Sequence, residues 1–236
     1  MGFMTELPST FDRFAARIFP DNPSGKVRDR FRLLARVTVL EKDRALEFDH
    51  AHSQLVFVSK GATKLVAHVS KSRDQIVGFN FTGDIFSIPE RGNYSYSVCA
   101  LSDCEVMSLS SDELLDLAAN EAKTLRHLLE HSYVSLTRYR EKTIALGTKT
   151  AGERVAVFLL AMAERIGIDD DGLPCLDLPM SRRDIAESLG LTIETVSRQL
   201  SLLRDAGLIA TVGRSGIELR NLAGLRTSAG YLHETT

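Results

Sequence analysis

Residues 178–209 read LPMSRRDIAESLGLTIETVSRQLSLLRDAGLI, and this stretch decides the fold of the C-terminal part of the chain. Ser181 and Asp184 have the spacing of a capping box, in which two side chains satisfy free N–H groups at a helix start. The helix that they begin ends at Gly190, and a second helix follows with Thr192 as its N-cap. Two short helices joined by a tight glycine turn predict a helix-turn-helix.

The second helix of this pair has an apolar face and a separate polar face. The apolar face is formed by Ile193, Val196, Leu200 and Leu203. Glu194, Ser197 and Arg198 share the other face, near the helix end that enters the major groove in such motifs. Arginine can donate two hydrogen bonds to guanine, and glutamate can accept one from cytosine. The alternative is a solvated Glu194–Arg198 pair at i, i+4; the preceding turn makes base reading the favoured interpretation.

A hairpin follows the second helix and predicts a wing. Its strands are Leu208–Val212 and Ile217–Leu219, and Arg214 at the tip is placed to touch a phosphate or the minor groove. Between residues 181 and 226, seven arginines and no lysine face five acidic residues, and guanidinium groups suit bidentate recognition of bases and phosphates. The predicted contacts to the DNA backbone are Ser181, Arg182, Arg183, Thr192, Thr195 and Arg214.

A long helix is predicted from Ser111, as its N-cap, to about Leu146, because this stretch has neither glycine nor proline. From Ala118 onwards its apolar and small positions alternate in steps of four and three, which is a heptad seam. A helix of this length extends past a small β domain, so we interpret it as one strand of a dimer. The alternative is a helix packed on its own β domain. The predicted seam contacts are Leu125, Leu129, Leu136, Tyr139 and Leu146.

Residues 20–110 read as β structure, preceded by short amphipathic helices at Asp12–Phe19 and Lys26–Leu34. Short runs rich in β-branched and aromatic residues are separated by turn signals, which indicates a sandwich, roll or barrel. The predicted strands are Leu55–Val58, Lys64–His68, Gln75–Phe79, Tyr94–Ala100 and Glu105–Leu109. In the C-terminal part, Ala151–Ile166 is a predicted helix, Cys175–Leu178 a strand and Asp169–Asp171 a solvated loop.

The composition is that of an ordinary globular protein, with 44% hydrophobic and 25% charged residues and a net charge of −2. No apolar run approaches the ~20 residues of a transmembrane helix, and the first residues contain no signal-peptide core, so we expect a cytoplasmic protein without a membrane partner. The three cysteines lack metal-ligand spacing and predict free thiols. Cys175 lies just before the helix-turn-helix, where its oxidation would disturb DNA docking; the alternative is a small buried hydrophobe.

With these residues in view, the chain resembles the Crp–Fnr family of bacterial transcription regulators over most of its length. Residues 178–209 carry the resemblance, and Glu194–Arg198 looks like the recognition helix of the Fnr and FixK members. The resemblance implies an α+β chain with a cyclic-nucleotide-binding-like β-roll in 1–110, a dimerisation helix in 111–146 and a winged helix-turn-helix in 147–236. Gly61 and the run Ile76–Asp84 fit the turns of that roll.

The same resemblance implies a function. It implies a homodimer on a palindrome like TTGAT-N4-ATCAA, contact with RNA polymerase, and activation rather than repression. Glu194, Ser197 and Arg198 would then read the half-site.

The sequence departs from the sensing members of that family. No cysteine precedes Cys99, which argues against an Fnr-type iron–sulfur cluster. Cyclic-AMP receptors have a Gly-Glu-Leu turn and an Arg followed by Ser or Thr; here the turn is Gly83-Asp84-Ile85, and Tyr94–Cys99 contains no arginine. Arg91 would then be the one arginine nearby to bind the phosphate of a cyclic nucleotide. His68 is a potential heme ligand, but a single strand histidine is more often structural. We therefore predict no cofactor.

A function from another class is a cupin-like metal-dependent enzyme, or a ligand-binding module that uses the β domain. His50 and His52 suggest it, since imidazoles on one strand face bind metals. That motif needs a glutamate shortly after the histidine pair, but Val56 and Phe57 occupy those positions. It also needs a third histidine on a later strand, and the sequence around Glu90 contains none. We therefore place the pair in a polar turn and predict no enzyme, no catalytic residue and no metal site.

Overall fold

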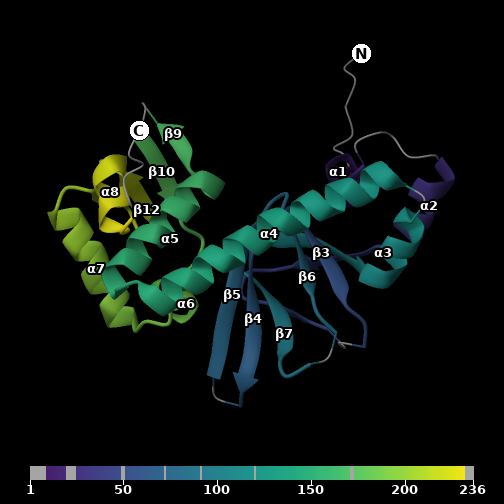
Figure 1. Ribbon diagram of the computed structural model, residues 1–236, viewed down its shortest axis with the longest axis horizontal. Coiled ribbons are helices and arrows are strands. Elements are labelled where there is room, and N and C mark those ends of the chain that lie inside the picture. The colour runs from purple at the N-terminus through teal and green to yellow at the C-terminus, as the bar shows by residue number, and fades with distance from the viewer. Residues whose placement is uncertain are drawn as a thin grey trace. The chain divides into compact units, whose positions relative to one another are not determined.

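The computed structural model describes residues 9–19, 25–48, 51–71, 73–90, 92–119, 121–170 and 173–231. The chain forms two compact units, and the boundary lies between Thr137 and Arg138, inside helix α4 (Ala122–Thr148) (Figure 1). This helix therefore contributes its first turns to one unit and its last turns to the other. No helix in the described ranges combines the length and apolar character that crossing a bilayer requires.

The first unit is a roll of two antiparallel sheets. Its strands in the described ranges are β1 (Arg36–Leu40), β2 (Ala45–Glu47), β3 (Gln54–Lys60), β4 (Ala62–Ser70), β5 (Arg73–Phe81), β6 (Ile85–Ile88), β7 (Ser95–Ala100) and β8 (Cys104–Ser110). One sheet has the order β1-β8-β3-β6 and the other β2-β7-β4-β5, so the consecutive strands β3 and β4 lie in different sheets. Gly61 makes the turn between them with φ +83°, and a Cβ there would lie 2.4 Å from the Asp103 carbonyl oxygen. The turn therefore requires glycine.

Successive side chains along each strand point to opposite faces of its sheet, and those on the inner faces form the interior of the roll. Leu65 of β4 faces Val98 of β7, Val58 of β3 faces Val106 of β8, and all four side chains are buried in one cluster. The cluster lies between the two sheets, so this interior is the core that the alternating pattern predicts.

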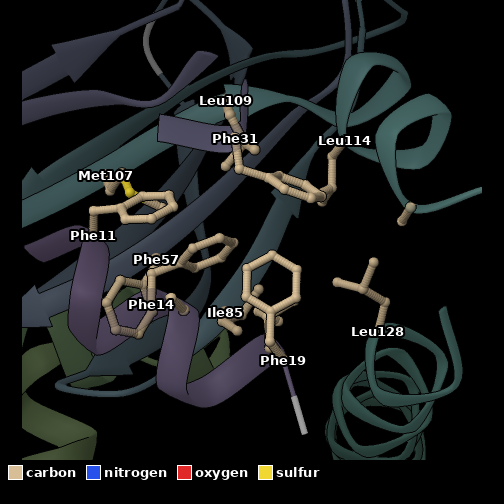
Figure 2. Packing of buried hydrophobic residues seen from close by; sticks show 13 residues of the cluster. Phe11, Phe14, Phe19, Phe31, Phe57, Ile85, Met107, Leu109, Leu114 and Leu128 are labelled. Carbon is tan, nitrogen blue, oxygen red and sulfur yellow. The ribbon is translucent and has the colours of Figure 1, made fainter. Parts of the chain in front are cut away.

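Short helices cover the other face of the β1-β8-β3-β6 sheet. They are α1 (Thr10–Ile18), α2 (Gly25–Leu34) and α3 (Ser111–Ala118). Figure 2 shows the aromatic side chains that they place against the sheet. Phe14 meets Phe57 of β3 edge to face at 5.6 Å between ring centroids, and Phe19 meets Phe31 at 4.9 Å. Leu128 from the first turns of α4 belongs to the same cluster.

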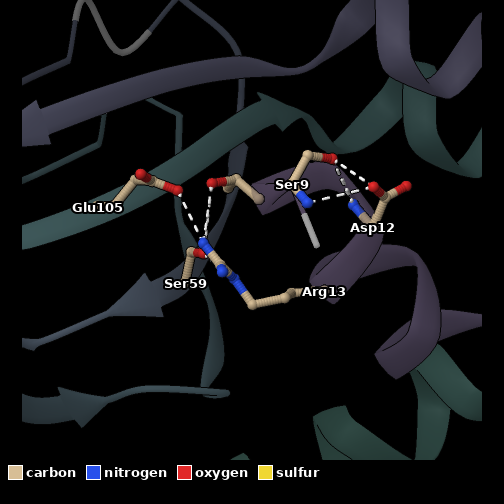
Figure 3. Close-up of polar contacts among 6 residues, drawn as sticks. Ser9, Asp12, Arg13, Ser59 and Glu105 are labelled. Carbon is tan, nitrogen blue, oxygen red and sulfur yellow. Dashed lines mark hydrogen bonds and ion pairs between the residues drawn. The ribbon is translucent and has the colours of Figure 1, made fainter. Parts of the chain in front are cut away.

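Helix α1 is also held to the roll by polar contacts (Figure 3). The Arg13 side chain donates to Ser59 Oγ at 2.7 Å and to Glu105 Oε1 at 3.1 Å. Ser9 and Asp12 form a capping box at the start of this helix. The N-terminal helix is therefore an integral part of the roll.

The second unit is a winged helix-turn-helix. It contains the last turns of α4 and the elements α5 (Ala151–Ile166), β9 (Ile168–Asp170), β10 (Leu173–Asp177), α6 (Arg182–Leu189), α7 (Ile193–Asp205), β11 (Ile209–Val212), β12 (Gly216–Leu219) and α8 (Leu222–Ser228). The strands form an antiparallel sheet in the order β11-β12-β10-β9. The predicted apolar positions of α5, Val155, Phe158, Leu159 and Met162, are all buried. The predicted α+β fold, with a β-roll and a winged helix-turn-helix, is confirmed.

The prediction of one helix over 111–146 was wrong. Ser110, not Ser111, is the N-cap of α3, and this helix ends at Ala118 before α4 begins at Ala122. Two i→i−3 hydrogen bonds tighten the end of α3. The Ala119 N–H donates to the Asp116 carbonyl, and the Glu121 N–H donates to the Ala118 carbonyl. A straight helix would separate Leu114 from Leu128 by about 21 Å. The break lets both leucines pack in the cluster of Figure 2.

Three strands of the roll, β1, β2 and β6, were not predicted from the sequence. They are three to five residues long, and β1 lies at a sheet edge with Val37 and Val39 exposed, so a local pattern hardly marks them. The predicted loop at Asp169–Asp171 is also corrected in part, because Ile168–Asp170 pairs with β10 as strand β9, while Asp171 lies outside the described residues. The backbone ladder with β10 defines this strand.

Candidate DNA-binding site

Helix α6 begins and ends where the sequence indicated. Asp184 Oδ2 accepts bonds from the Ser181 backbone N–H at 2.8 Å and from its hydroxyl at 2.6 Å, and Ser181 Oγ accepts from Asp184 N–H at 3.2 Å. At the other end Gly190 has φ +63°, a left-handed conformation that other residues adopt only with strain. The capping box and the glycine turn are therefore confirmed, and they determine where the second helix of the motif starts.

Helix α7 starts at the Thr192 N-cap, whose hydroxyl accepts a bond from Thr195 N–H at 3.2 Å. Val196, Leu200 and Leu203 are buried, and Ile193 is half-buried. These side chains bury one face of the helix, so the opposite face is presented outward near the helix N-terminus.

That outward face carries Glu194, Ser197 and Arg198, which are all exposed. Hydrogen bonds from its own backbone N–H and from the Thr192 hydroxyl lower the pKa of the Glu194 carboxyl, so it is ionised at neutral pH. Among the described residues no ion pair joins Glu194 to Arg198. The alternative of a surface ion pair between them thus has no support in this geometry, and both charged groups are available to a partner.

The wing has the predicted form. Strands β11 and β12 pair from Ile209–Leu219 to Val212–Gly216, and Gly213 at the tip has φ +61°. Arg214 is exposed beside it. The Ser215 hydroxyl donates to Asp177 Oδ1 of β10 at 2.6 Å, so the base of the tip is held to the neighbouring strand.

The predicted backbone-contact residues differ in their accessibility. Arg183 is exposed next to the start of α6, together with the Ser181 N-cap. The Thr192 and Thr195 hydroxyls lie 3.1 Å apart and bond to each other. Arg182 is half-buried, its Nη1 is enclosed without a partner, and burial lowers its pKa. Of the three arginines predicted to contact phosphate, Arg183 and Arg214 are therefore exposed and Arg182 is not fully so.

The predicted dimer seam lies only partly on an open face of α4. Leu129 and Leu136 are 50% and 51% exposed, whereas Leu125 packs into the cluster of the roll. Tyr139 and Leu146 are half-buried.

The cysteines are free, and they lie in different places. Cys175 is half-buried on β10, paired with Ile168 and Glu218. Burial raises the pKa of the thiols of Cys99 on β7 and Cys104 on β8. Raised pKa values disfavour the reactive thiolate, so Cys99 and Cys104 behave as structural cysteines.

Potential ligand-binding residues of the roll are engaged in other bonds. His68 bonds through Nδ1 to Asp74 at 2.9 Å and through Nε2 to Ser97 at 2.9 Å, so both ring nitrogens are occupied. Asp84 accepts from Phe81 N–H at 2.8 Å within its own turn. His50 and Arg91 lie outside the described residues, and within the described part no three His, Cys, Asp or Glu residues gather as metal ligands would.

Sequence reasoning missed Arg154, which lies one residue after the α5 capping box and bonds to three backbone carbonyls. An arginine in the first turn of a helix is unremarkable by itself. Only the fold brings the ends of two other helices to it.

Comparison with known proteins identifies both units. The Crp-like helix-turn-helix domain family matches residues 153–228, and the cyclic nucleotide-binding domain family matches residues 42–121. The chain is 34% identical to the nitrogen fixation regulation protein FixK of Azorhizobium caulinodans, over 75% of this chain and 72% of that protein. It is 32% identical to the transcriptional activator protein FnrL of Cereibacter sphaeroides, over 73% and 71% of the two chains.

A solved structure agrees with these relatives. The structure of FixK2 from Bradyrhizobium japonicum superposes with a TM-score of 0.74 at 32% identity, covering 84% of this chain and 98% of that one. The relatives are transcription regulators and not enzymes, which removes the cupin-like alternative. The roll, the exposed face of α7, the wing and these similarities together show that the chain belongs to the Crp–Fnr family of DNA-binding transcription regulators.

Proposed function

We propose that this regulator binds a palindrome like TTGAT-N4-ATCAA as a homodimer, and that Glu194, Ser197 and Arg198 of α7 read each half-site. The observation that carries the proposal is the exposure of these three side chains on one face of a helix whose other face is buried. Arg198 is suited to guanine O6 and N7, and the ionised Glu194 to the cytosine amino group. Ser197, between them, can reach a base edge or a phosphate.

Contacts to the DNA backbone would hold α7 in register on the duplex. Arg183 lies on α6, which precedes α7 in the sequence, and Arg214 lies on the wing, which follows it. Both side chains are exposed. Phosphate contacts from Ser181, Arg182, Thr192 and Thr195 complete the proposed set. The free N–H groups at the N-termini of α6 and α7 favour phosphate for the same electrostatic reason.

The proposed dimer interface is the exposed face of α4. Leu129, Tyr133, Leu136 and Ile144 are each at least half exposed. With 3.6 residues per turn they fall within an arc of about 80° on the helix. Large apolar side chains in one stripe are typical of a helix that packs against a partner, and a second copy is the partner that a palindrome requires. The stripe retains Leu129 and Leu136 of the predicted seam and adds Tyr133 and Ile144.

The proposal includes activation through contact with RNA polymerase, because FnrL among the relatives is a named transcriptional activator. It includes no bound heme, iron–sulfur cluster or cyclic nucleotide. The occupied nitrogens of His68 support the exclusion of heme, the internal bond of Asp84 supports the exclusion of a cyclic nucleotide, and the lack of a cysteine before Cys99 supports the exclusion of an Fnr-type cluster. Oxidation of Cys175, which lies half-buried on the β-sheet of the winged unit, stays a prediction.

A DNA-binding titration tests the proposal. The full-length protein, purified without air, is titrated against TTGAT-N4-ATCAA and against a duplex with scrambled half-sites, at one salt concentration because phosphate contacts make affinity salt-dependent. The titration is repeated with cyclic AMP and after mild oxidation, for the protein and for Cys175→Ser. We expect selective binding without added ligand. Equal affinity for both duplexes under every condition would refute the proposed half-site.

A further inference from the structure

The start of helix α5 lies next to the C-terminal ends of α4 and α6, and Arg154 bonds to both. Its Nη2 donates to the Leu146 carbonyl of α4 at 2.8 Å, and its Nη1 donates to the Leu189 carbonyl of α6 at 3.2 Å. Its Nε donates to the Lys149 carbonyl, in the turn between α4 and α5, at 2.9 Å. One guanidinium group therefore joins three segments of the winged unit.

These carbonyls need a donor from outside their own helices. The last four carbonyls of any helix lack an intrahelical partner. Thr150 N–H is the group that would continue the α4 ladder to Leu146, but it donates to Glu153 Oε2 at 2.7 Å in the capping box of α5. Leu189 is the last residue of α6, next to the left-handed Gly190. A cation is also favoured at both positions, because helix C-termini carry partial negative charge.

Two further contacts tie the same elements together. Lys142 of α4 donates to the Ser188 hydroxyl of α6 at 2.9 Å. Gly152, in the first turn of α5, lies beside Gln199 of α7, since a Cβ at this position would lie 3.0 Å from Gln199 Oε1. The N-terminal turn of α5 thus holds α4 and α6 through Arg154, and it meets the reading helix α7 directly.

We propose that Arg154 is a positioning residue for DNA recognition, which sets the angle between the reading helix α7 and the last turns of α4 and thereby determines the preferred spacing of half-sites. The inference rests on the proposed function, in which two copies pair through α4 and each α7 reads one half-site. The separation of the two reading helices in such a dimer depends on how each is held on its own α4. The bonds of the Arg154 guanidinium are to backbone carbonyls of its own unit, so Arg154 contributes selectivity for spacing and not for the half-site sequence.

A lysine cannot replace this arginine. The guanidinium donates in three directions in one plane, whereas a lysine ammonium at the end of a flexible stem is a point charge. Arg154→Lys therefore keeps the positive charge near the helix ends and loses the link between them. Arg204→Lys is the matched control, because Arg204 is exposed in the last turn of α7 and bonds to its neighbour Asp205.

The test measures the spacing preference of the full-length protein. Affinities are determined for TTGAT and ATCAA half-sites separated by three, four, five and six base pairs, and for a duplex with a single half-site, at one salt concentration. We expect the wild type and Arg204→Lys to prefer the four-base-pair spacer by about tenfold or more. We expect Arg154→Lys to reduce that preference about fivefold or more, with single-half-site binding unchanged within about twofold.

The outcomes separate this inference from the proposed function. A wild type without any spacer preference would refute the palindrome, and with it the role of Arg154 in setting the half-site spacing. A wild type that prefers four base pairs, together with an Arg154→Lys variant of the same preference, would overturn the positioning role. If Arg154→Lys fails to fold by circular dichroism, Arg154→Gln, which keeps a neutral amide donor, is measured in the same way. An equal loss of affinity for the single half-site and for the palindrome would also overturn the inference, since it would indicate general disruption of the winged unit.

Discussion

Replacement of Arg198 by alanine is the most direct perturbation of the proposed reading face. The side chain is exposed and has no ion pair in the described part of the chain, so its removal should change the free energy of unfolding by no more than about 0.5 kcal/mol. A bidentate contact to guanine contributes about 1–3 kcal/mol of discrimination. A dimer loses this contact twice, so the expected loss is about 2–6 kcal/mol, or about 30-fold to 10⁴-fold in affinity.

The assay is a titration of labelled TTGAT-N4-ATCAA with the full-length variant, next to a thermal melt that reports folding. Arg204→Ala is the matched control, because Arg204 lies on the same helix with its charge already balanced by Asp205. We expect the control to retain specific binding, and Arg198→Ala to bind the palindrome no better than scrambled DNA. A folded Arg198→Ala protein with unchanged affinity for the palindrome would refute the assignment of α7 as the base-reading helix.

Three further predictions concern other parts of the molecule. Glu194→Ala should relax the preference at one base pair by about 1–3 kcal/mol while it weakens total binding less, measured on single-base-pair variants of the half-site; equal losses on matched and altered sites would contradict the contact. Leu136→Glu should convert the dimer to a monomer in sedimentation experiments, because it places a charge in the apolar stripe of α4, whereas Val37→Glu, on the exposed edge strand β1, should not. Burial lowers the pKa of Lys142 from its usual 10.5 to about 8. Between these two pH values the unfolded chain binds more protons than the folded chain, so the free energy of unfolding should rise with pH. Relative to Lys142→Met, the wild type should gain about 1–2 kcal/mol in denaturant unfolding between pH 7 and pH 9.5, and identical pH profiles would show that Lys142 is not desolvated.

The sequence alone was sufficient for the helix-turn-helix, because every signal there is local. The capping box of Ser181 and Asp184 spans four residues, and the left-handed Gly190 directly follows the last residue of the same helix. The apolar stripe of α7 repeats within one helix, and Glu194, Ser197 and Arg198 follow from it by helical spacing. Local hydrogen bonds and helix periodicity depend on neighbouring residues only, so the sequence is enough to predict this site.

The three missed strands and the broken helix depended on contacts between distant segments. β1 exists because residues 36–40 pair with residues 104–108, and its own side chains are largely exposed. The helix over 111–146 has no glycine or proline to announce its break, and the reason for the break is a cluster that gathers Leu114 and Leu128 with residues of α1, α2 and the sheet. Such long-range packing overrides local helix propensity.

The sequence by itself therefore determined helices α6 and α7, their caps, the wing and the family of this regulator. Only the tertiary structure decided which face of α4 stays open, and only the tertiary structure brought the carbonyls of Leu146, Lys149 and Leu189 to one guanidinium group. The physical reason is that a cap or an amphipathic face is completed by residues a few positions away, whereas burial and the pairing of orphan carbonyls depend on elements that meet only in the folded chain.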